Sequence, residues 1–198
     1  MAETWLTSDL HLGHDFVARL RGFDDHQDHD TTIARNWDRR VQPGDQVWVL
    51  GDVAMNGWAA RLNWFTQRPG TKHLVLGNHD RAHPLHRSAH AHLRTYLEVF
   101  ETVQVAAQLR HRGRSLLLSH FPYGGEGETR TEHEDRYTQW RLRDEGGVLL
   151  HGHVHDTVRV RRSAADSTMV HVGLDAWGLA PVTLTEAVGL TEGASTAG

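Results

Sequence analysis

The segment "VWVLGDVAMNGW" (residues 47–58) places a short apolar run directly before a glycine and a carboxylate, Gly51 and Asp52. An unbroken apolar run is typical of a strand buried on both faces, and such a strand has no evident reason to finish on a carboxylate. In open α/β sheets, ligands bind beyond the carboxyl ends of the strands, so repeated polar endings predict a shared site. Four more segments end in this way, in Asp, Asn or His: "WLTSDLHLGHD" (5–15), "HLVLGNHD" (73–80), "SLLLSHF" (115–121) and "GVLLHGHVH" (147–155).

The order of the expected elements indicates a two-sheet core flanked by helices. The first half alternates between strands over 4–8, 46–50 and 72–76 and helices over 26–41, 57–67 and 84–97. The second half is mostly strands, with a short helix over 137–143 and a mobile surface loop over 121–136. The expected strands there cover 99–109, 115–119, 147–151, 157–162 and 168–172, with the first two forming a hairpin through "HRGR". No repeat or linker divides the chain, so we expect one domain over residues 1–190 and a disordered tail over 191–198.

The composition excludes several classes of protein. The 198 residues carry a net charge of -4 with His neutral, which gives no general attraction for nucleic acid. The absence of cysteine excludes disulfides, thiolate zinc sites and a cysteine nucleophile, and it fits a reducing compartment. No segment approaches the roughly 20 apolar residues that span a bilayer, and the N-terminus does not resemble a signal peptide. We therefore expect a cytoplasmic protein without membrane association, and we assign no oligomeric state.

Histidine is the unusual residue type, with 17 in the chain, and most of these are ordinary surface side chains. A chain of this composition contains roughly one Asp-x-His by chance, so Asp9-Leu10-His11 is weak on its own. "GNHD" at 77–80 is far rarer, and it follows a clean strand. Position is the second argument, because randomly placed surface histidines would not follow strand ends five times.

The residues at these strand ends suit a pair of metal ions. Side chains two apart in an extended segment point the same way, so Asp9 and His11 can reach one ion, and His153 and His155 can likewise both face the site. The set is too large for a single ion with an open position, and Asp52 stands alone between the paired motifs as the natural bridge. Mixed oxygen and imidazole ligands suit Mn, Fe, Ni, Co or Zn better than magnesium. The candidate ligands are Asp9, His11, Asp52, Asn78, His120, His153 and His155.

The order D-x-H, G-D, G-N-H-D, H, G-H-x-H over residues 9–155 resembles the calcineurin-like metallophosphoesterase superfamily. The segments "DLHLGHD", "LSHFPY" and "VGLDAWGLAPV" are similar to a small subgroup found in bacteria and phages. The resemblance implies an α/β fold, a four-layer α-β-β-α sandwich of two mixed sheets flanked by helices in a single domain. It also implies that two divalent ions, with Mn²⁺ favoured, share Asp52. The first ion corresponds to Asp9, His11, Asp52 and His155, and the second to Asp52, Asn78, His120 and His153.

The resemblance also implies a mechanism. A metal-bridging hydroxide would attack a phosphoester in line, and His79 would protonate the leaving oxygen. Asp80 would accept a hydrogen bond from the other ring nitrogen of His79 and so fix its tautomer. Both residues are therefore predicted to be catalytic.

Other residues near the motifs have two interpretations each. His14 could contact a metal-bound phosphate or the first metal, or it could support the ligands or begin a helix. Arg21 and Arg81 could contact a phosphate or support the ligands, and each alone is more often a solvated charge. Trp177 could stack on a base, although a core tryptophan is the simpler interpretation. His151 is expected to pack under the site. Gly51, Gly77 and Gly152 are expected to let the backbone approach the metals closely.

The predicted substrate is a small phosphodiester, a cyclic or linear nucleotide, because the sequence shows no dense arginine cluster for a dianionic monoester. The loop at 121–136 and Trp177 are where we expect base contacts. A metal-dependent nuclease and a phosphomonoesterase are the alternatives within the same chemistry, and nucleic acid is the less favoured substrate. A non-enzymatic metal-binding scaffold is a third interpretation, which the complete ligand set opposes.

Overall fold

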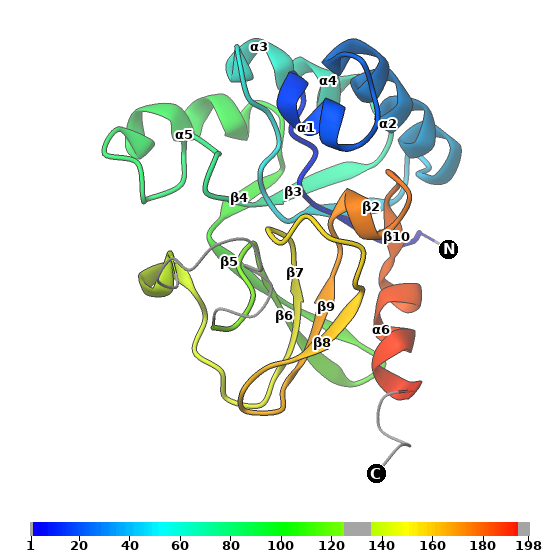
Figure 1. The fold of residues 1–198 in the computed structure, drawn as a ribbon, viewed down its shortest axis with the longest axis vertical. Coiled ribbons are helices and arrows are strands. Elements are labelled where there is room, and N and C mark those ends of the chain that lie inside the picture. The colour runs from blue at the N-terminus through cyan, green and yellow to red at the C-terminus, as the bar shows by residue number, and fades with distance from the viewer. Residues whose placement is uncertain (1, 125–135, 194–198) are drawn as a thin grey trace.

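Two mixed five-stranded sheets form the frame of the protein in the computed structural model, which describes residues 2–124 and 136–193. The first sheet has the order β10-β1-β2-β3-β4 and the second the order β5-β6-β7-β9-β8. Buried side chains of both sheets, such as Leu6, Val75, Leu118 and Val170, form one core cluster between them. The predicted fold class, two mixed sheets flanked by helices in a single domain, is confirmed (Figure 1).

The first sheet brings the ends of its parallel strands to one edge. Strands β1 (Thr4–Thr7), β2 (Gln46–Val49), β3 (Thr71–Val75) and β4 (Thr102–Gln104) run parallel, and β10 (Val182–Thr183) pairs antiparallel with β1. The loops that follow β1, β2 and β3 therefore leave the sheet side by side. Three of the five polar endings are in these loops.

Four helices contribute to the core cluster on the first sheet and a fifth, α1 (Asp15–Leu20), packs against α2 (His26–Arg40); Figure 1 shows all five on the side away from the second sheet. The longest is α2, whose first turn is capped by the Asp25 carboxylate accepting from the N–H groups of Gln27 and Asp28. Its buried face carries Ile33 and Trp37, as the four-residue spacing predicts. The others are α3 (Trp58–Arg61), α4 (Asn63–Thr66) and α5 (Ala89–Leu97).

Two of the expected helices are shorter or broken. The helix expected over 57–67 is two single turns, α3 and α4, separated by Leu62, whose ψ of -26° is that of a 3₁₀ turn. The helix expected over 84–97 begins only at Ala89, because residues 81–88 form successive turns tied to the loop after β3. Those ties include the Arg81 N–H to the Tyr96 hydroxyl (3.0 Å) and the His86 ring to the Asn78 carbonyl (3.0 Å).

The second sheet consists of β5 (Ala106–His111), β6 (Arg114–Ser119), β7 (Val148–His151), β8 (Val160–Arg162) and β9 (Thr168–His171). The single strand expected over 99–109 is wrong: the chain leaves the first sheet after β4, passes through the exposed Val105 and enters the second sheet as β5. The hairpin between β5 and β6 is confirmed. Its turn residues Arg112 and Gly113 both have positive φ, which is the I′ pattern that matches strand twist.

The remaining elements are η1 (Thr138–Trp140), η2 (Leu174–Ala176) and α6 (Leu184–Gly193). Helix α6 includes residues 191–193, which we expected in the tail, and the rest of that tail lies outside the described residues. The expected surface loop is partly core, because Phe121 and Tyr123 are each only 1% exposed; residues 125–135 of that loop lie outside the described residues. Within 2–124 and 136–193, no helix has both the length and the apolar character needed to cross a membrane.

Candidate metal centre

All seven predicted ligands are on loops that follow β1, β2, β3, β6 and β7, and the structure brings them together. The first two loops are joined by backbone hydrogen bonds, from Asp9 N–H to the Gly51 carbonyl (3.0 Å) and from His11 N–H to the Asp52 carbonyl (2.9 Å). The loop after β7 is joined to them by His153 N–H, which donates to the Asp9 carboxylate at 3.0 Å. Loops from both sheets are thus fixed against one another before any ion is considered.

The ligands have an unusual backbone conformation. Nine non-glycine residues of the described chain have positive φ, and five of these nine are predicted ligands. Left-handed backbone costs an L-residue free energy and concentrates at functional sites, although Asp and His tolerate it better than branched side chains. It turns each side chain sharply away from its strand and toward the centre. The five are Asp9 (60°), His11 (48°), Asp52 (54°), His153 (76°) and His155 (48°).

Glycines make room for these close approaches, as predicted. A Cβ at Gly77 would lie 2.3 Å from an Asp52 carboxylate oxygen, and one at Gly152 would lie 2.5 Å from Oδ2 of Asp9. A Cβ at Gly51 would lie 2.7 Å from Nδ1 of His120. Each distance is shorter than a real carbon contact, so a side chain at any of the three would displace a ligand.

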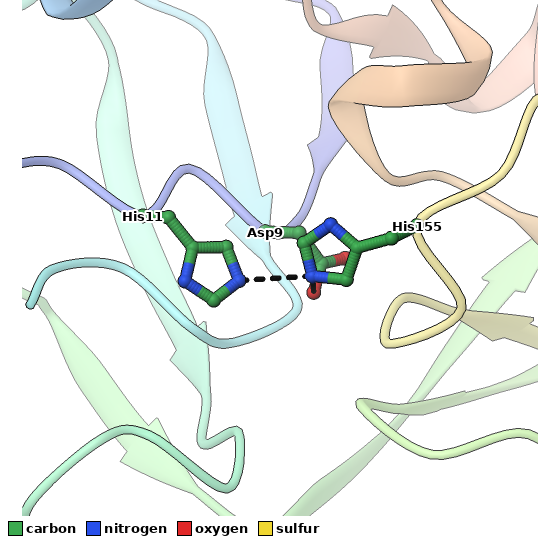
Figure 2. Close-up of side chains that lie close together, drawn as sticks. All are labelled: Asp9, His11 and His155. Atoms are coloured by element: carbon green, nitrogen blue, oxygen red, sulfur yellow. Dashed lines mark hydrogen bonds and ion pairs between the residues drawn. The ribbon is translucent and has the colours of Figure 1, made fainter. Parts of the chain in front are cut away.

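The first group of ligand atoms surrounds Nε2 of His155. This atom lies 3.0 Å from Nε2 of His11 and 3.6 Å from Oδ1 of Asp9 (Figure 2). Nε2 of His11 is in turn 3.6 Å from Oδ2 of Asp52. These four residues are those predicted for the first ion.

The second group surrounds Nε2 of His120. This atom lies 3.0 Å from Oδ1 of Asn78, 3.3 Å from Nδ1 of His153 and 3.5 Å from Oδ2 of Asp52. The same carboxylate oxygen of Asp52 therefore approaches a histidine of each group. That position is the one expected of a shared ligand.

The donor sets fit cations. Nδ1 of His120 donates to the Leu50 carbonyl at 2.7 Å, so the neutral ring directs the lone pair of Nε2 at the oxygen of Asn78. Nδ1 of His155 lies 3.2 Å from the Asp175 carboxylate, which holds the proton on that nitrogen and frees Nε2 in the same way. Electron-pair donors that face one another at such distances are stabilised by a metal ion between them. Within the described residues, close-packed ligand atoms gather in two sets, Asp9 with His11 and His155, and Asp9 with Asp52 and His120.

The electrostatics of the centre agree with this assignment. Burial, reinforced by the charge of Asp9, raises the pKa of Asp52 well above its usual value. For Asp9, burial acts upward but His155 and the other nearby histidines outweigh it, and its pKa is lowered. Burial also lowers the pKa of His11 and His153 well below the usual value, which keeps both rings in the neutral form that binds metal.

A second layer of charge orients the first group. The guanidinium of Arg21 donates to both oxygens of Asp175, at 2.8 and 2.7 Å, and to the Asp9 carbonyl at 2.8 Å. Although burial acts upward on Asp175, its contacts with Arg21 and His155 hold its pKa far below the usual range. Arg21 is thus a supporting residue rather than a substrate contact. Asp175 is a further candidate site residue, which follows the strand at 168–172 much as the predicted ligands follow theirs.

His79 and Asp80 have different roles from one another. The His79 side chain is 44% exposed, and its Nε2 lies 3.9 Å from Oδ2 of Asp52 at the rim of the centre. Burial lowers its pKa to about 4. The predicted contact between Asp80 and the His79 ring is wrong: Asp80 is fully buried and accepts from the N–H groups of Asp52 (3.0 Å), Val53 (3.1 Å) and Gly77 (2.7 Å). Asp80 therefore fixes the ligand loops instead of orienting His79.

The structure also places the remaining residues that the sequence singled out, His14, Arg81, Trp177 and His151. The His14 ring lies 5.7 Å from that of His11, which puts it beside the first group. Arg81 is exposed and lines a cavity next to His79. Trp177 donates its indole N–H to the His171 carbonyl and lies against the Arg159 guanidinium, contacts that favour the structural interpretation of this residue. His151 stacks on His171 below the site, as expected.

Comparisons with known proteins show the family of the chain and agree with its fold. The family model for the calcineurin-like phosphoesterase superfamily domain matches residues 4–177. The gene 66 protein of Mycobacterium phage L5 is 44% identical over 189 residues, covering 90% of this chain and 89% of its own. The gene 66 protein of Mycobacterium phage D29 is 45% identical over 185 residues, covering 89% of this chain and 90% of its own. The solved structure of a protein of unknown function from Aquifex aeolicus has a TM-score of 0.68 at 23% identity, covering 96% of this chain and all of that one, and shows the shared fold.

Proposed function

The chain belongs to the calcineurin-like phosphoesterase superfamily, and we propose that it is a dinuclear metal-dependent phosphodiesterase. One observation carries the proposal. A single oxygen, Oδ2 of Asp52, lies 3.6 Å from Nε2 of His11 in the first group and 3.5 Å from Nε2 of His120 in the second. A bridging carboxylate in this position supports two ions rather than one.

The seven ligands offer three oxygen-bearing and four imidazole side chains, a mixture that favours Mn²⁺ or another first-row transition metal. Asp9, His11 and His155 would hold one ion with Asp52, and the second would have the remaining set, Asn78, His120 and His153. When bound, the ions would supply Lewis-acid activation of the phosphoryl group and an activated water. Arg21 and Asp175 keep the His155 ring in the tautomer that this requires.

His79 is the chain's candidate for moving a proton. Its side chain is exposed at the rim, and its backbone N–H donates to Oδ1 of Asp52 at 2.8 Å, which ties its position to the centre. A bound phosphoester brings negative charge, which raises the pKa of a nearby imidazole from its depressed value of about 4. His79 would then give the proton of Nε2 to the leaving oxygen.

A phosphodiester is favoured over a monoester because the arginines near the centre are few and mostly engaged. Arg21 is occupied by Asp175, and the cavity beside His79 contributes one arginine, Arg81. A singly charged diester needs no larger cluster. We propose a small, nucleotide-type substrate and a cytoplasmic location on the same grounds as the sequence analysis.

The test is a panel of substrates assayed with Mn²⁺, Fe²⁺, Ni²⁺, Co²⁺, Zn²⁺ and Mg²⁺. We expect kcat/KM to be higher for bis-4-nitrophenyl phosphate than for 4-nitrophenyl phosphate, and higher for cyclic nucleotides than for DNA. A reversed first comparison would make the protein a phosphomonoesterase, and a reversed second one a nuclease. Metal binding without hydrolysis of any substrate would support the interpretation of the protein as a non-enzymatic metal-binding scaffold.

A further inference from the structure

A cavity of about 330 Å³ adjoins the rim of the metal centre at His79. It is lined by residues 54–58 of the loop after β2 and by His79, Arg81 and His86 of the segment after β3. Its volume is at the lower end of the range for small-molecule pockets. Because His79 belongs both to the rim and to the cavity, a group that leaves the phosphorus beside His79 would enter this cavity.

Trp58 gives the cavity a rigid aromatic wall. Its indole stacks on the ring of Tyr96, with centroids 5.1 Å apart and planes inclined by 11°, and the His92 ring abuts it at 5.4 Å. Tyr96 is fully buried, and its hydroxyl accepts from the Arg81 N–H at 3.0 Å. One face of the indole is therefore supported by the ring of Tyr96, and the Trp58 side chain also lines the cavity. A preorganised aromatic face of this kind binds nucleobases.

The polar side chains of the cavity are cationic or neutral. None of its lining residues is acidic, and Arg81 is exposed, with no hydrogen bond or ion pair to its guanidinium from the described residues. His86 donates from Nε2 to the Asn78 carbonyl, which leaves Nδ1 as an acceptor for an amino group. An aromatic wall, one cation and one acceptor match a nucleobase together with a phosphate.

We propose that this cavity is the leaving-group subsite, and that it takes a nucleoside 5′-phosphate whose ribose oxygen is the one released. The base would stack on Trp58, and the 5′-phosphate would pair with Arg81. This inference rests on the proposed function and deepens it by naming the leaving group. It narrows the substrate to nucleotides with a second phosphate, because a cyclic monophosphate has none to pair with Arg81. It also moves the expected base contact from Trp177 to Trp58.

The test measures binding of the leaving group as a separate molecule. The Mn²⁺-loaded protein is titrated by calorimetry with adenosine 5′-monophosphate, adenosine and ribose 5-phosphate. Stacking predicts that the monophosphate binds about 5- to 150-fold more tightly than ribose 5-phosphate. Trp58→Ala should abolish this preference, and Trp58→Phe should keep most of it. Thermal unfolding of each variant checks that the Tyr96 support is intact.

The phosphate is tested in the same way. The monophosphate should bind about tenfold more tightly than adenosine, and Arg81→Gln should remove that difference. Arg87→Gln, an exposed arginine six residues further along, is the matched control and should retain it. A phosphate preference that survives Arg81→Gln, or a base preference that survives in a folded Trp58→Ala variant, would overturn the subsite. Hydrolysis of bis-4-nitrophenyl phosphate by the same wild-type preparation tests the proposed function separately, so either can fail alone.

Discussion

Replacing Asp175 with asparagine should disable the first metal position and spare the second. The carboxylate of Asp175 holds the proton of His155 on Nδ1 across 3.2 Å, so that Nε2 faces His11 and Asp9 with a lone pair. The asparagine NH₂ group competes as a donor at that position and favours the opposite tautomer. The proton would then sit on Nε2, where the metal should bind.

The magnitude follows from two contacts. Loss of a residue that orients a metal ligand typically costs 10–100-fold in metal affinity. The substitution also leaves Arg21, whose side chain is 4% exposed, with one acceptor in place of two charged ones. Breaking a buried charge-assisted hydrogen bond costs about 1.5–3 kcal/mol, and we expect a loss of unfolding free energy near the lower end because the asparagine oxygen still accepts one bond.

Metal per chain, measured by elemental analysis after dialysis at a series of Mn²⁺ concentrations, should show one weakened site and one site of wild-type affinity. Asp156→Asn is the matched control, since Asp156 also receives two hydrogen bonds from an arginine, Arg161, at 2.7 and 3.2 Å. Although Asp156 follows His155 in the chain, its carboxylate has no hydrogen bond or ion pair with a predicted ligand. The control should bind two ions normally. Wild-type affinity at both sites in Asp175→Asn would refute the tautomer argument, and equal weakening of both would show that the groups are not separable.

Four further predictions come from the same contacts. Asp52→Asn should weaken both metal sites at once, seen as metal content well below two ions per chain; full occupancy would remove Asp52 from the bridging position. His79→Ala should keep the metals but lower kcat about 10²–10⁴-fold for alkoxide leaving groups and less for nitrophenolate, and an equal loss for both would argue against a proton donor. Asp80→Asn should destabilise the fold by about 1–3 kcal/mol, measured by urea unfolding, because an amide cannot accept from three N–H groups; an unchanged midpoint would contradict this. Burial lowers the pKa of His83 to about 4, so the contribution of this neutral ring to stability is complete above pH 6.5 and is lost as pH falls toward 4. In the metal-free protein, His83→Gln should therefore reduce the fall of Tm between pH 6.5 and pH 4, and an unchanged fall would count against this reasoning.

The gathering of the seven candidate ligands could be predicted from the sequence, because each follows an apolar strand within a few residues and such strand ends meet at one edge of the fold. The role of Asp80 could not be predicted, because its neighbour His79 suggested a shared site. Consecutive residues direct their side chains differently, and Asp80 turns under the loop to accept from Asp52, Val53 and Gly77. Likewise, the passage of the chain from β4 in the first sheet to β5 in the second could not be predicted, because strands of both sheets have the same pattern of apolar residues. The sequence shows which residues are buried but not which sheet buries them.

The backbone of the ligands explains why the motifs have the form they do. Five of the seven ligands have positive φ, at a cost of order 1–3 kcal/mol each, and such strain persists only where the surroundings fix the conformation. Here the backbone hydrogen bonds between the loops and the buried Asp80 carboxylate fix the conformation of the ligand loops. The glycines, which have no Cβ, leave room for the ligand side chains. Asp and His suit these positions for two reasons: they tolerate a left-handed backbone better than most residues, and their side chains bind metal. The Gly-Asp and Gly-His pairs at the strand ends are therefore one solution to two requirements, a sharp turn out of a buried strand and a donor atom placed immediately after it.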